Sequence, residues 1–213
     1  MRQIKERKKI LHVPKTQEIF YCLSGMPSYC KILANEITDK PFIDFLRWLV
    51  TKNFYNERTE KISIKQIAVD YKSEPTKVTK WIKEIYEEIF ELNYNRPELF
   101  QQEGIKIELY IKYYDNSCFF NTTLQVIPRE FEMIRFPFVK GQVGADQFWV
   151  KKIEYTIEDD RQTATLWLDG KTLNKYREFA LDKALFQGWI HFMDVYEKHS
   201  SELDKELKRI YPN

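Results

Sequence analysis

The stretch that decides the fold runs from Ser63 to Ile82 and reads S-I-K-Q-I-A-V-D-Y-K-S-E-P-T-K-V-T-K-W-I. Ser63 followed three residues later by Gln66 forms a capping box, which predicts that a helix begins there. Ser73 is a good N-cap residue and Pro75 suits the first turn of a helix. The stretch therefore predicts two helices in succession, separated by a tight turn.

The second of these helices carries one continuous apolar stripe. Its members recur at alternating steps of four and three residues, which is the spacing of one buried helix face: Val78, Ile82, Ile85, Ile89 and Leu92. The positions that point outward are Thr76, Lys77, Thr79, Lys80 and Lys83.

These residues resemble the helix-turn-helix family of DNA-binding domains, including its winged-helix members. The resemblance rests on the following residues: Ile67, Ala68, Tyr71, Val78, Trp81 and Ile82. A small residue such as Ala68 lets the two helices cross closely, and Val78 and Trp81 supply apolar contacts for the second helix. The sequence departs from the family at Lys72, where a turn glycine is common, and at Ser73, where an apolar residue usually follows. The resemblance covers about a tenth of the chain.

The resemblance implies that the second helix is a recognition helix, whose N-terminal end enters the major groove of double-stranded DNA. Lysines there would neutralise phosphates, and threonine hydroxyls would meet phosphates or base edges. The DNA-binding residues expected on this basis are Lys65, Lys72, Thr76, Lys77, Thr79, Lys80 and Lys83.

The charge along this segment fits that expectation. From Ile62 to Lys83 five lysines face only Asp70 and Glu74, whereas Glu84, Glu87, Glu88 and Glu91 then reverse the sign. A solvated helix with Lys–Glu pairs, such as Lys80 with Glu84 and Lys83 with Glu87, fits the same residues. Acidic residues in the last turns oppose the helix dipole, so stability alone would not select this order.

Composition places the chain among ordinary globular proteins. Of its 213 residues 43% are hydrophobic, 31% are charged and 15% are aromatic, and the aromatic content predicts sheets with aromatic cross-strand packing. The net charge is only +2, so any affinity for DNA must come from a local patch.

The cysteines, the histidines and the hydropathy indicate the compartment of the protein and argue against disulfides, metal sites and membrane spans. Cys22, Cys30 and Cys118 are an odd number without a close pair, and the three histidines have no metal-ligand spacing with them. Free thiols fit a reducing cytosol. No apolar run approaches the ~20 residues that span a bilayer, and the basic N-terminus lacks the features of a signal peptide. We therefore expect a cytoplasmic protein without a membrane partner.

Residues 39–95 are predicted to form the helix-turn-helix domain. A first helix is expected to begin at Asp39-Lys40-Pro41, with Phe42, Phe45, Leu46, Leu49 and Val50 on its buried face. Together with the two helices that follow the polar loop 53–61, it makes the smallest closed core of this kind. Residues 1–38 form a lead-in, with a possible strand at 19–21 and a short helix at 29–36. Its basic residues can reach DNA beside the domain or belong to a solvated terminus. They are Arg2, Lys5, Arg7, Lys8, Lys9 and Lys15.

After Gly104 the hydrophobic period changes from 3.6 to 2, which predicts a second domain at 105–213. Strands are expected at 105–113 and 118–127 as a hairpin, and at 148–158 and 163–168 as a second pair joined at 159–162. The first hairpin stands where a winged helix carries its wing, but its strands are long enough to belong to a sheet. Residues 128–139 are ambiguous, and 140–147 read as a loop. The C-terminus is predicted to be helical, with an aromatic stripe from Tyr176 to Tyr196 that covers the sheet or makes a dimer contact.

Catalytic chemistry is not expected. Gly141 to Gly144 lacks the third glycine and the preceding strand of a dinucleotide loop, and no phosphate-binding Gly-Lys-Ser/Thr or Gly-x-Ser-x-Gly motif is present. Acidic pairs at Asp159-Asp160 and at Glu130 with Glu132 are typical of solvated turns rather than of metal sites. Asp169-Gly170-Lys171 has the spacing of a nuclease triple, but its glycine indicates a turn.

The sequence thus predicts an α+β protein: a three-helix helix-turn-helix module followed by an antiparallel, aromatic-rich sheet with C-terminal helices. The function expected is DNA binding, as a transcriptional regulator or a mobile-element accessory factor, without enzymatic activity, cofactor or metal. The competing interpretation is a non-catalytic scaffold that binds a protein partner or a second copy through its aromatic second domain.

Overall fold

The computed structural model describes residues 11–52, 54, 62–101, 103–158, 161–198 and 200–212. The helices are α1 (Thr16–Gly25), α2 (Pro27–Glu36), α3 (Ile43–Val50), α4 (Ile64–Asp70), α5 (Pro75–Asn95), η1 (Pro97–Leu99), η2 (Pro137–Val139), α6 (Lys140–Val143), α7 (Lys175–Phe186), α8 (Phe192–Glu197) and α9 (Ser200–Ile210). The strands are β1 (Ile105–Tyr113), β2 (Asn116–Leu124), β3 (Met133–Arg135), β4 (Gln147–Glu158) and β5 (Arg161–Asp169). The fold is α+β, as the sequence predicts.

Within the described residues the strands form one five-stranded sheet in the order β2-β1-β5-β4-β3. The two predicted hairpins are confirmed, since β1 pairs with β2 and β4 with β5 in antiparallel register. The expectation of a purely antiparallel sheet is wrong, because β1 and β5 pair in parallel from Ile107 opposite Ala164 to Lys112 opposite Asp169. Hairpin signals are local, whereas this central pairing joins residues more than fifty positions apart.

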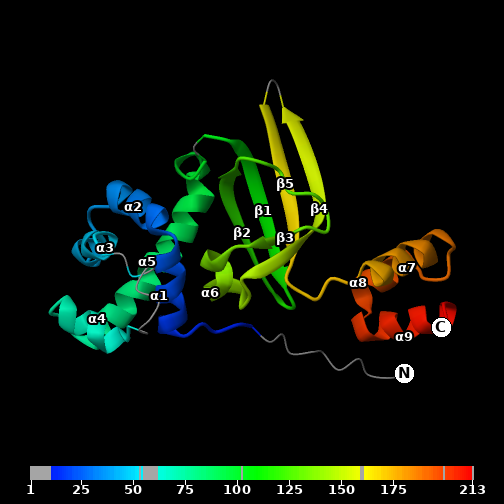
Figure 1. Cartoon of the computed structure of the whole chain (residues 1–213), viewed down its shortest axis with the longest axis horizontal. Coiled ribbons are helices and arrows are strands. Elements are labelled where there is room, and N and C mark those ends of the chain that lie inside the picture. The colour runs from blue at the N-terminus through cyan, green and yellow to red at the C-terminus, as the bar shows by residue number, and fades with distance from the viewer. Residues whose placement is uncertain are drawn as a thin grey trace. The chain divides into compact units, whose positions relative to one another are not determined.

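One hydrophobic core joins the helices α1 to α5 to one face of this sheet. Phe20, Leu46 and Ile82 from the helices belong to the same buried cluster as Leu109 and Leu166 from the strands. In Figure 1 these helices gather on one side of the sheet, with α5 running alongside α1 and towards β2. The chain divides into compact units after Lys171 rather than after residue 95. The expected domain boundary at 95–105 therefore falls inside a single compact unit.

The second compact unit begins at Thr172 and contains α7, α8 and α9. It has a small core of its own: Leu181, Ala184, Ile190, Leu203 and Leu207. Most of the predicted aromatic stripe lies outside this core. The exposed residues are Tyr176, Phe179, Phe186, Trp189, Met193 and Tyr196.

Three local expectations are corrected by the structure. Residues 19–21 belong to helix α1, whose buried side is formed by Ile19, Phe20, Cys22 and Leu23. Helix α3 begins at Ile43 rather than at residues 39–41. The loop expected at 140–147 contains the short helix α6, which ends at Gly144 with φ 85°. In the ambiguous segment 128–139, the structure has strand β3 and helix η2.

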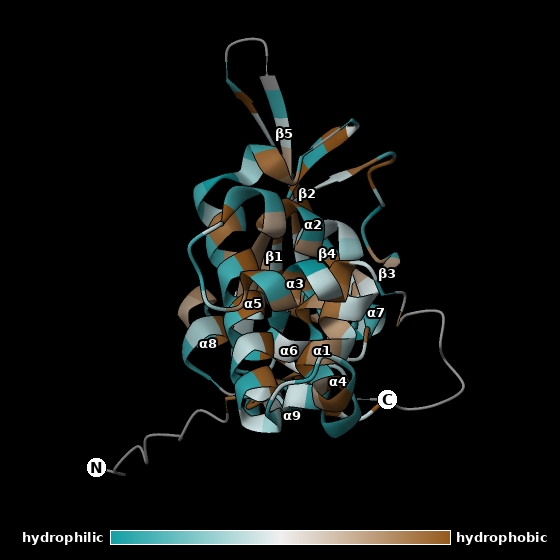
Figure 2. Cartoon of the chain, turned by 90° about the vertical axis from the view of Figure 1, so that its left-hand side faces the viewer, coloured by the Kyte–Doolittle hydropathy of each residue, from teal (hydrophilic) through white to brown (hydrophobic). Residues whose placement is uncertain are grey.

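The hydropathy of the helices agrees with this arrangement. The helices α3, α4 and α5 show both teal and brown bands in Figure 2, as expected for helices that bury one side and expose the other. None of the helices in the described part of the chain has the length and apolar character needed to span a bilayer.

Candidate nucleic-acid interface

Helix α4 begins as its sequence predicts. Ser63 has an extended N-cap conformation, and its hydroxyl accepts a hydrogen bond from the Gln66 backbone N–H at 3.2 Å. The Gln66 side chain does not complete the capping box, because it donates to Asp70 instead at 2.8 Å. A single N-cap bond of this kind typically contributes about 1 kcal/mol to helix stability.

The turn after α4 is a Schellman motif with lysine in the position that glycine usually takes. The Ser73 N–H donates to the Ala68 carbonyl at 2.8 Å, and the Lys72 N–H donates to the Val69 carbonyl at 3.0 Å. Lys72 has φ 58°, the left-handed conformation that this motif requires. The sequence departs from the helix-turn-helix family at Lys72, yet the lysine backbone adopts the conformation that a turn glycine would have.

Helix α5 begins one residue later than expected. Ser73 is not its N-cap, because its backbone is used to close α4. Glu74 takes the N-cap position in an extended conformation, and Pro75 occupies the first helical position, where its missing N–H leaves no hydrogen bond unmade.

The buried sides of α4 and α5 are those that the sequence predicts. Ala68 is 1% exposed and both Val78 and Ile82 are fully buried, so a small residue and two branched ones fill the crossing. The apolar stripe of α5 is confirmed for Val78, Ile82, Ile85 and Ile89. Leu92 is half-buried, and Tyr86 and Asn93 are buried in addition.

An aromatic cluster fixes α3 against α4 and α5. Tyr71, at the end of α4, lies 5.1 Å from Phe45 and 5.2 Å from Trp48 between ring centroids. Trp81 of α5 lies 5.6 Å from Phe45. Edge-to-face and offset ring pairs of this kind add to simple burial and favour one arrangement of the rings. The three helices are thus held together by contacts at the position where the sequence expects the motif to cross.

The expected DNA-binding residues lie on the outer side of this structure. Thr76, Lys77, Lys80 and Lys83 are exposed on α5, and Lys65 and Lys72 are exposed on α4 and the turn. Thr79 is half-buried, which restricts its reach compared with Thr76. From Thr76 to Lys83 the helix rises by about 10 Å. The structure therefore places six of the seven expected residues at the surface and one at its margin.

Ion pairs leave most of these lysines available. Lys80 lies 3.5 Å from Glu84 in an exposed pair, which is worth little in water. The expected pair between Lys83 and Glu87 is not found among the described residues. Further along α5, Glu88 is engaged by Lys40 at 2.5 Å. The positive charge of the first turns of α5 is thus neutralised at only one position by the described part of the chain.

The hairpin that stands at the position of a wing is part of the sheet, as the length of its strands predicts. The β1–β2 hairpin is hydrogen-bonded along its whole length and β1 also pairs with β5, so it does not project from the three helices as a free loop. Of the basic N-terminal arm, Arg2, Lys5, Arg7, Lys8 and Lys9 lie outside the described residues. Lys15 takes the N-cap position of α1.

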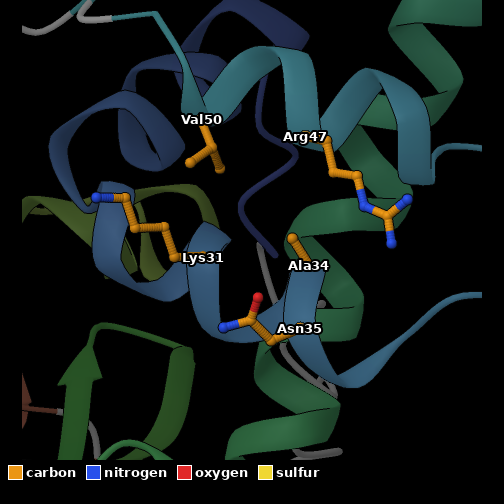
Figure 3. Close-up of a pocket in the computed structure, with 5 residues that line it drawn as sticks. All are labelled: Lys31, Ala34, Asn35, Arg47 and Val50. Carbon is orange, nitrogen blue, oxygen red and sulfur yellow. The ribbon is translucent and has the colours of Figure 1, made fainter.

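A groove between α2 and α3 is lined in part by basic residues. It has a volume of about 360 Å³ and is lined by Lys31, Ala34, Asn35, Arg47 and Val50. Figure 3 shows these side chains, with Arg47 extending away from the groove rather than into it. None of the lining residues is buried, so the groove is an open surface rather than a built catalytic or cofactor site.

The residues considered for metal binding or catalysis do not form a centre. Asp159 and Asp160 lie outside the described residues. Glu132 accepts a hydrogen bond from the Arg129 N–H at 2.9 Å, and Asp169 accepts one from the Lys171 N–H at 2.9 Å, as in ordinary turns. The described residues contain no cluster of three or more metal-ligating side chains.

The cysteines are free thiols in apolar surroundings. Cys22 and Cys30 are buried and Cys118 is half-buried. Burial raises the pKa of the Cys22 thiol to about 11 and that of the Cys30 thiol to about 12. Both therefore remain protonated at neutral pH, which is the opposite of what a nucleophilic or metal-binding cysteine needs.

Comparison of the chain with protein-family models, with curated proteins and with solved structures finds no significant match.

Proposed function

We propose that this protein binds double-stranded DNA through α4, the turn at Lys72 and the N-terminal half of α5. It would act as a transcriptional regulator or as an accessory factor of a mobile element. The observation that carries the proposal is the exposure of five lysines along α4, the turn and the N-terminal half of α5: Lys65, Lys72, Lys77, Lys80 and Lys83. We call this set the lysine surface.

The lysine surface suits a duplex in its position on the helix. Its lysines on α5 lie in the first turns, next to the N-terminus, where the partial positive charge of the helix adds to theirs. The glutamates that follow would be repelled by phosphates, so only the N-terminal end of α5 can approach DNA. This is the end that recognition helices insert into the major groove. Thr76, exposed in the first turn of α5, would contact base edges or phosphates.

A salt titration of binding to random duplex DNA tests the proposal. Each phosphate that a lysine neutralises contributes about −0.9 to the slope of log K against log salt, so replacing three lysines should flatten the slope by about 2.7. We expect Lys77→Glu/Lys80→Glu/Lys83→Glu to show this flatter slope and a large loss of affinity.

The matched control changes the net charge by the same amount elsewhere. Lys106, Lys112 and Lys205 are exposed and lie outside α4 and α5. Lys106→Glu/Lys112→Glu/Lys205→Glu should retain most of the binding and most of the salt slope. Equal affinity of the two triple variants would refute the lysine surface as the DNA-binding site.

A scaffold that binds protein is the competing function, and the exposed aromatic residues of the second unit favour it. Such a scaffold would show no salt-dependent association with duplex DNA. The same titration therefore discriminates the two functions.

A further inference from the structure

Strand β4 has an open edge over most of its length. On one side it pairs with β5 from Trp149 to Glu158. On the other side β3 pairs with it only as far as Trp149, and the chain before β3 adds hydrogen bonds at Val150. No strand of the described residues pairs with 151–158 on that side, and the β4–β5 hairpin extends beyond the other strands in Figure 1. Such an unpaired edge is a template for a strand of another chain.

The backbone groups that face this edge belong to alternate residues. Val150 faces it, because its N–H donates to the Glu132 carbonyl at 2.9 Å and its carbonyl accepts from the Phe131 N–H at 2.7 Å. The register with β5 shifts by one residue between Val150 and Lys152, as in a β-bulge. Beyond the bulge, the alternation of ladder bonds therefore turns the backbone groups of these residues towards the open edge: Ile153, Tyr155 and Ile157.

The side chains of these residues continue the apolar face of the sheet beyond the core. Ile153 packs against the buried cluster, whereas Tyr155 and Ile157 are 53% and 73% exposed. The opposite face of the strand is polar, with Lys152, Glu154, Thr156 and Glu158. A further strand with the same alternation would cover Tyr155 and Ile157 and keep its own polar face in water.

β4 is itself such a strand, and it is complementary to itself in one antiparallel register. A two-fold axis at Tyr155 lays this residue opposite its own copy and lays Ile153 opposite Ile157 of the second copy. Each N–H at the open edge then meets a carbonyl. On the polar face, the same axis lays Lys152 opposite Glu158, and the reverse. Apolar pairs and opposite charges directly across two strands stabilise their pairing.

The neighbouring registers are less favourable. An axis at Glu154 would lay this carboxylate opposite itself, and an axis at Thr156 would lay Glu154 opposite Glu158, and like charges in these positions destabilise a strand pair. Lys152 also contacts Glu154 of its own strand, but this ion pair is exposed and leaves the ammonium group able to meet a second carboxylate.

We propose that the open edge of β4 is a self-association site, at which β4 of a second copy of this chain adds antiparallel with its axis at Tyr155. The sheets of the two copies become one continuous sheet. The occupant is a second copy because the register that uses every backbone group of the open edge also pairs unlike charges. At the other edge of the sheet, Asn93 already bonds β2 at Asn121. The inference does not depend on DNA binding, since β4 lies outside α4 and α5.

Sedimentation equilibrium of the full chain without DNA tests this proposal. At ~100 µM the wild type should approach twice its chain mass of 25.9 kDa. Tyr155→Pro removes an N–H that faces the open edge, and proline is tolerated at such positions of edge strands. Both copies lose a hydrogen bond at the axis, so the dissociation constant should rise by roughly thirtyfold or more.

The matched control places proline on the other margin of the same hairpin. Gln162 is exposed and precedes the first residue of β5 that pairs with β1, which is Ala164. Gln162→Pro should therefore sediment as the wild type does. A monomeric wild type at ~100 µM, or equal weakening by the two proline variants, would overturn the proposal.

A charge exchange tests the register without changing an apolar residue. Lys152→Glu places carboxylates opposite each other at both ends of the paired strands, and Glu158→Lys places ammonium groups there, so each variant alone should associate more weakly than the wild type. An equimolar mixture of the two variants restores opposite charges across the axis and should form a mixed dimer more tightly than either variant pairs with itself. If the mixture sediments as the average of the two separate variants, the antiparallel register is wrong.

Discussion

Lys72 forms the turn between α4 and α5 in a backbone conformation that is energetically unfavourable for a residue with a Cβ. Its left-handed backbone allows the Schellman bonds that end α4 and releases the chain into α5. For a residue with a Cβ this conformation costs about 1 kcal/mol or more relative to glycine. Selection for stability would favour glycine here, whereas a lysine at the same place adds a charge to the lysine surface.

Replacing Lys72 separates the energetic cost of its left-handed backbone from the effect of its charge. We expect Lys72→Gly to raise the free energy of unfolding by about 0.5–1 kcal/mol, because glycine adopts the left-handed conformation without strain. Urea denaturation monitored by tryptophan fluorescence measures the change. Lys72→Ala is the matched control, since it removes the same charge but retains a Cβ. A glycine variant no more stable than the alanine variant would argue against strain at this turn.

At the scale of the elements, Asn93 joins the end of α5 to the free edge of the sheet. Its side-chain amide donates to the Asn121 carbonyl at 2.7 Å, and its side-chain oxygen accepts from the Asn121 N–H at 2.7 Å. Both residues are nearly inaccessible, at 1% and 4% exposure. The amide thus pairs with an edge strand as a neighbouring strand would, and it protects that edge from other chains.

The loss of this amide should weaken the whole first unit. Asn93→Leu keeps an apolar side chain of similar size but leaves the Asn121 N–H and carbonyl buried without their partner. Each unsatisfied group costs about 1–3 kcal/mol, so for the two groups we expect a loss of about 2–6 kcal/mol in the free energy of unfolding. Asn95→Leu, an exposed change two residues on, is the control for the gain in hydrophobicity. A loss below 1 kcal/mol on denaturation would contradict this role for Asn93.

Several elements could be predicted because their signals are local. Ser63 with Gln66 marks the start of α4, the spacing from Val78 to Ile89 marks the buried side of α5, and the alternation after Gly104 marks β1. The exposure of Thr76, Lys77, Lys80 and Lys83 on α5 follows from the same periodicity, whereas Thr79 is half-buried. Where several neighbouring residues share one pattern, the sequence alone is sufficient to predict the helix or strand that they form.

Other features depend on partners that a local pattern does not identify. The run Ile19-Phe20-Tyr21 is too short to distinguish a strand from a helix. In the structure it lies within α1, whose buried side also includes Cys22 and Leu23. The parallel pairing of β1 with β5 has no signal in either strand. Similarly, the spacing of the aromatic residues of α7 predicts a helix but does not say which of them are buried.

At the scale of the whole molecule, the two compact units divide the properties of the chain. The first unit carries the lysine surface on a core that continues from the helices into the sheet, so a change in that core affects the geometry of α4 and α5. The second carries the aromatic surface. The three cysteines all lie in the first unit, which makes its stability sensitive to alkaline pH.

The buried thiols give the sign of this pH dependence. Cys22 and Cys30 have folded pKa values of about 11 and about 12, above the ordinary thiol value of 9.0, because burial disfavours the thiolate. Below pH 9 both thiols are protonated whether the chain is folded or unfolded, and their contribution to stability is fully present. Above pH 9 the unfolded chain ionises first, so this contribution is lost as the pH rises towards the folded pKa values.

We therefore expect the free energy of unfolding to fall between pH 9 and about pH 11, by about 1.4 kcal/mol per pH unit for each of the two thiols once the unfolded thiol is ionised. Urea denaturation at pH 8, 9, 10 and 10.5 measures the slope. Lysines and tyrosines titrate in the same range, so the comparison is with Cys22→Ala/Cys30→Ala, whose slope should be shallower. Identical slopes for the two proteins would mean that Cys22 and Cys30 are accessible to water in the folded chain, which would contradict the core that supports α5.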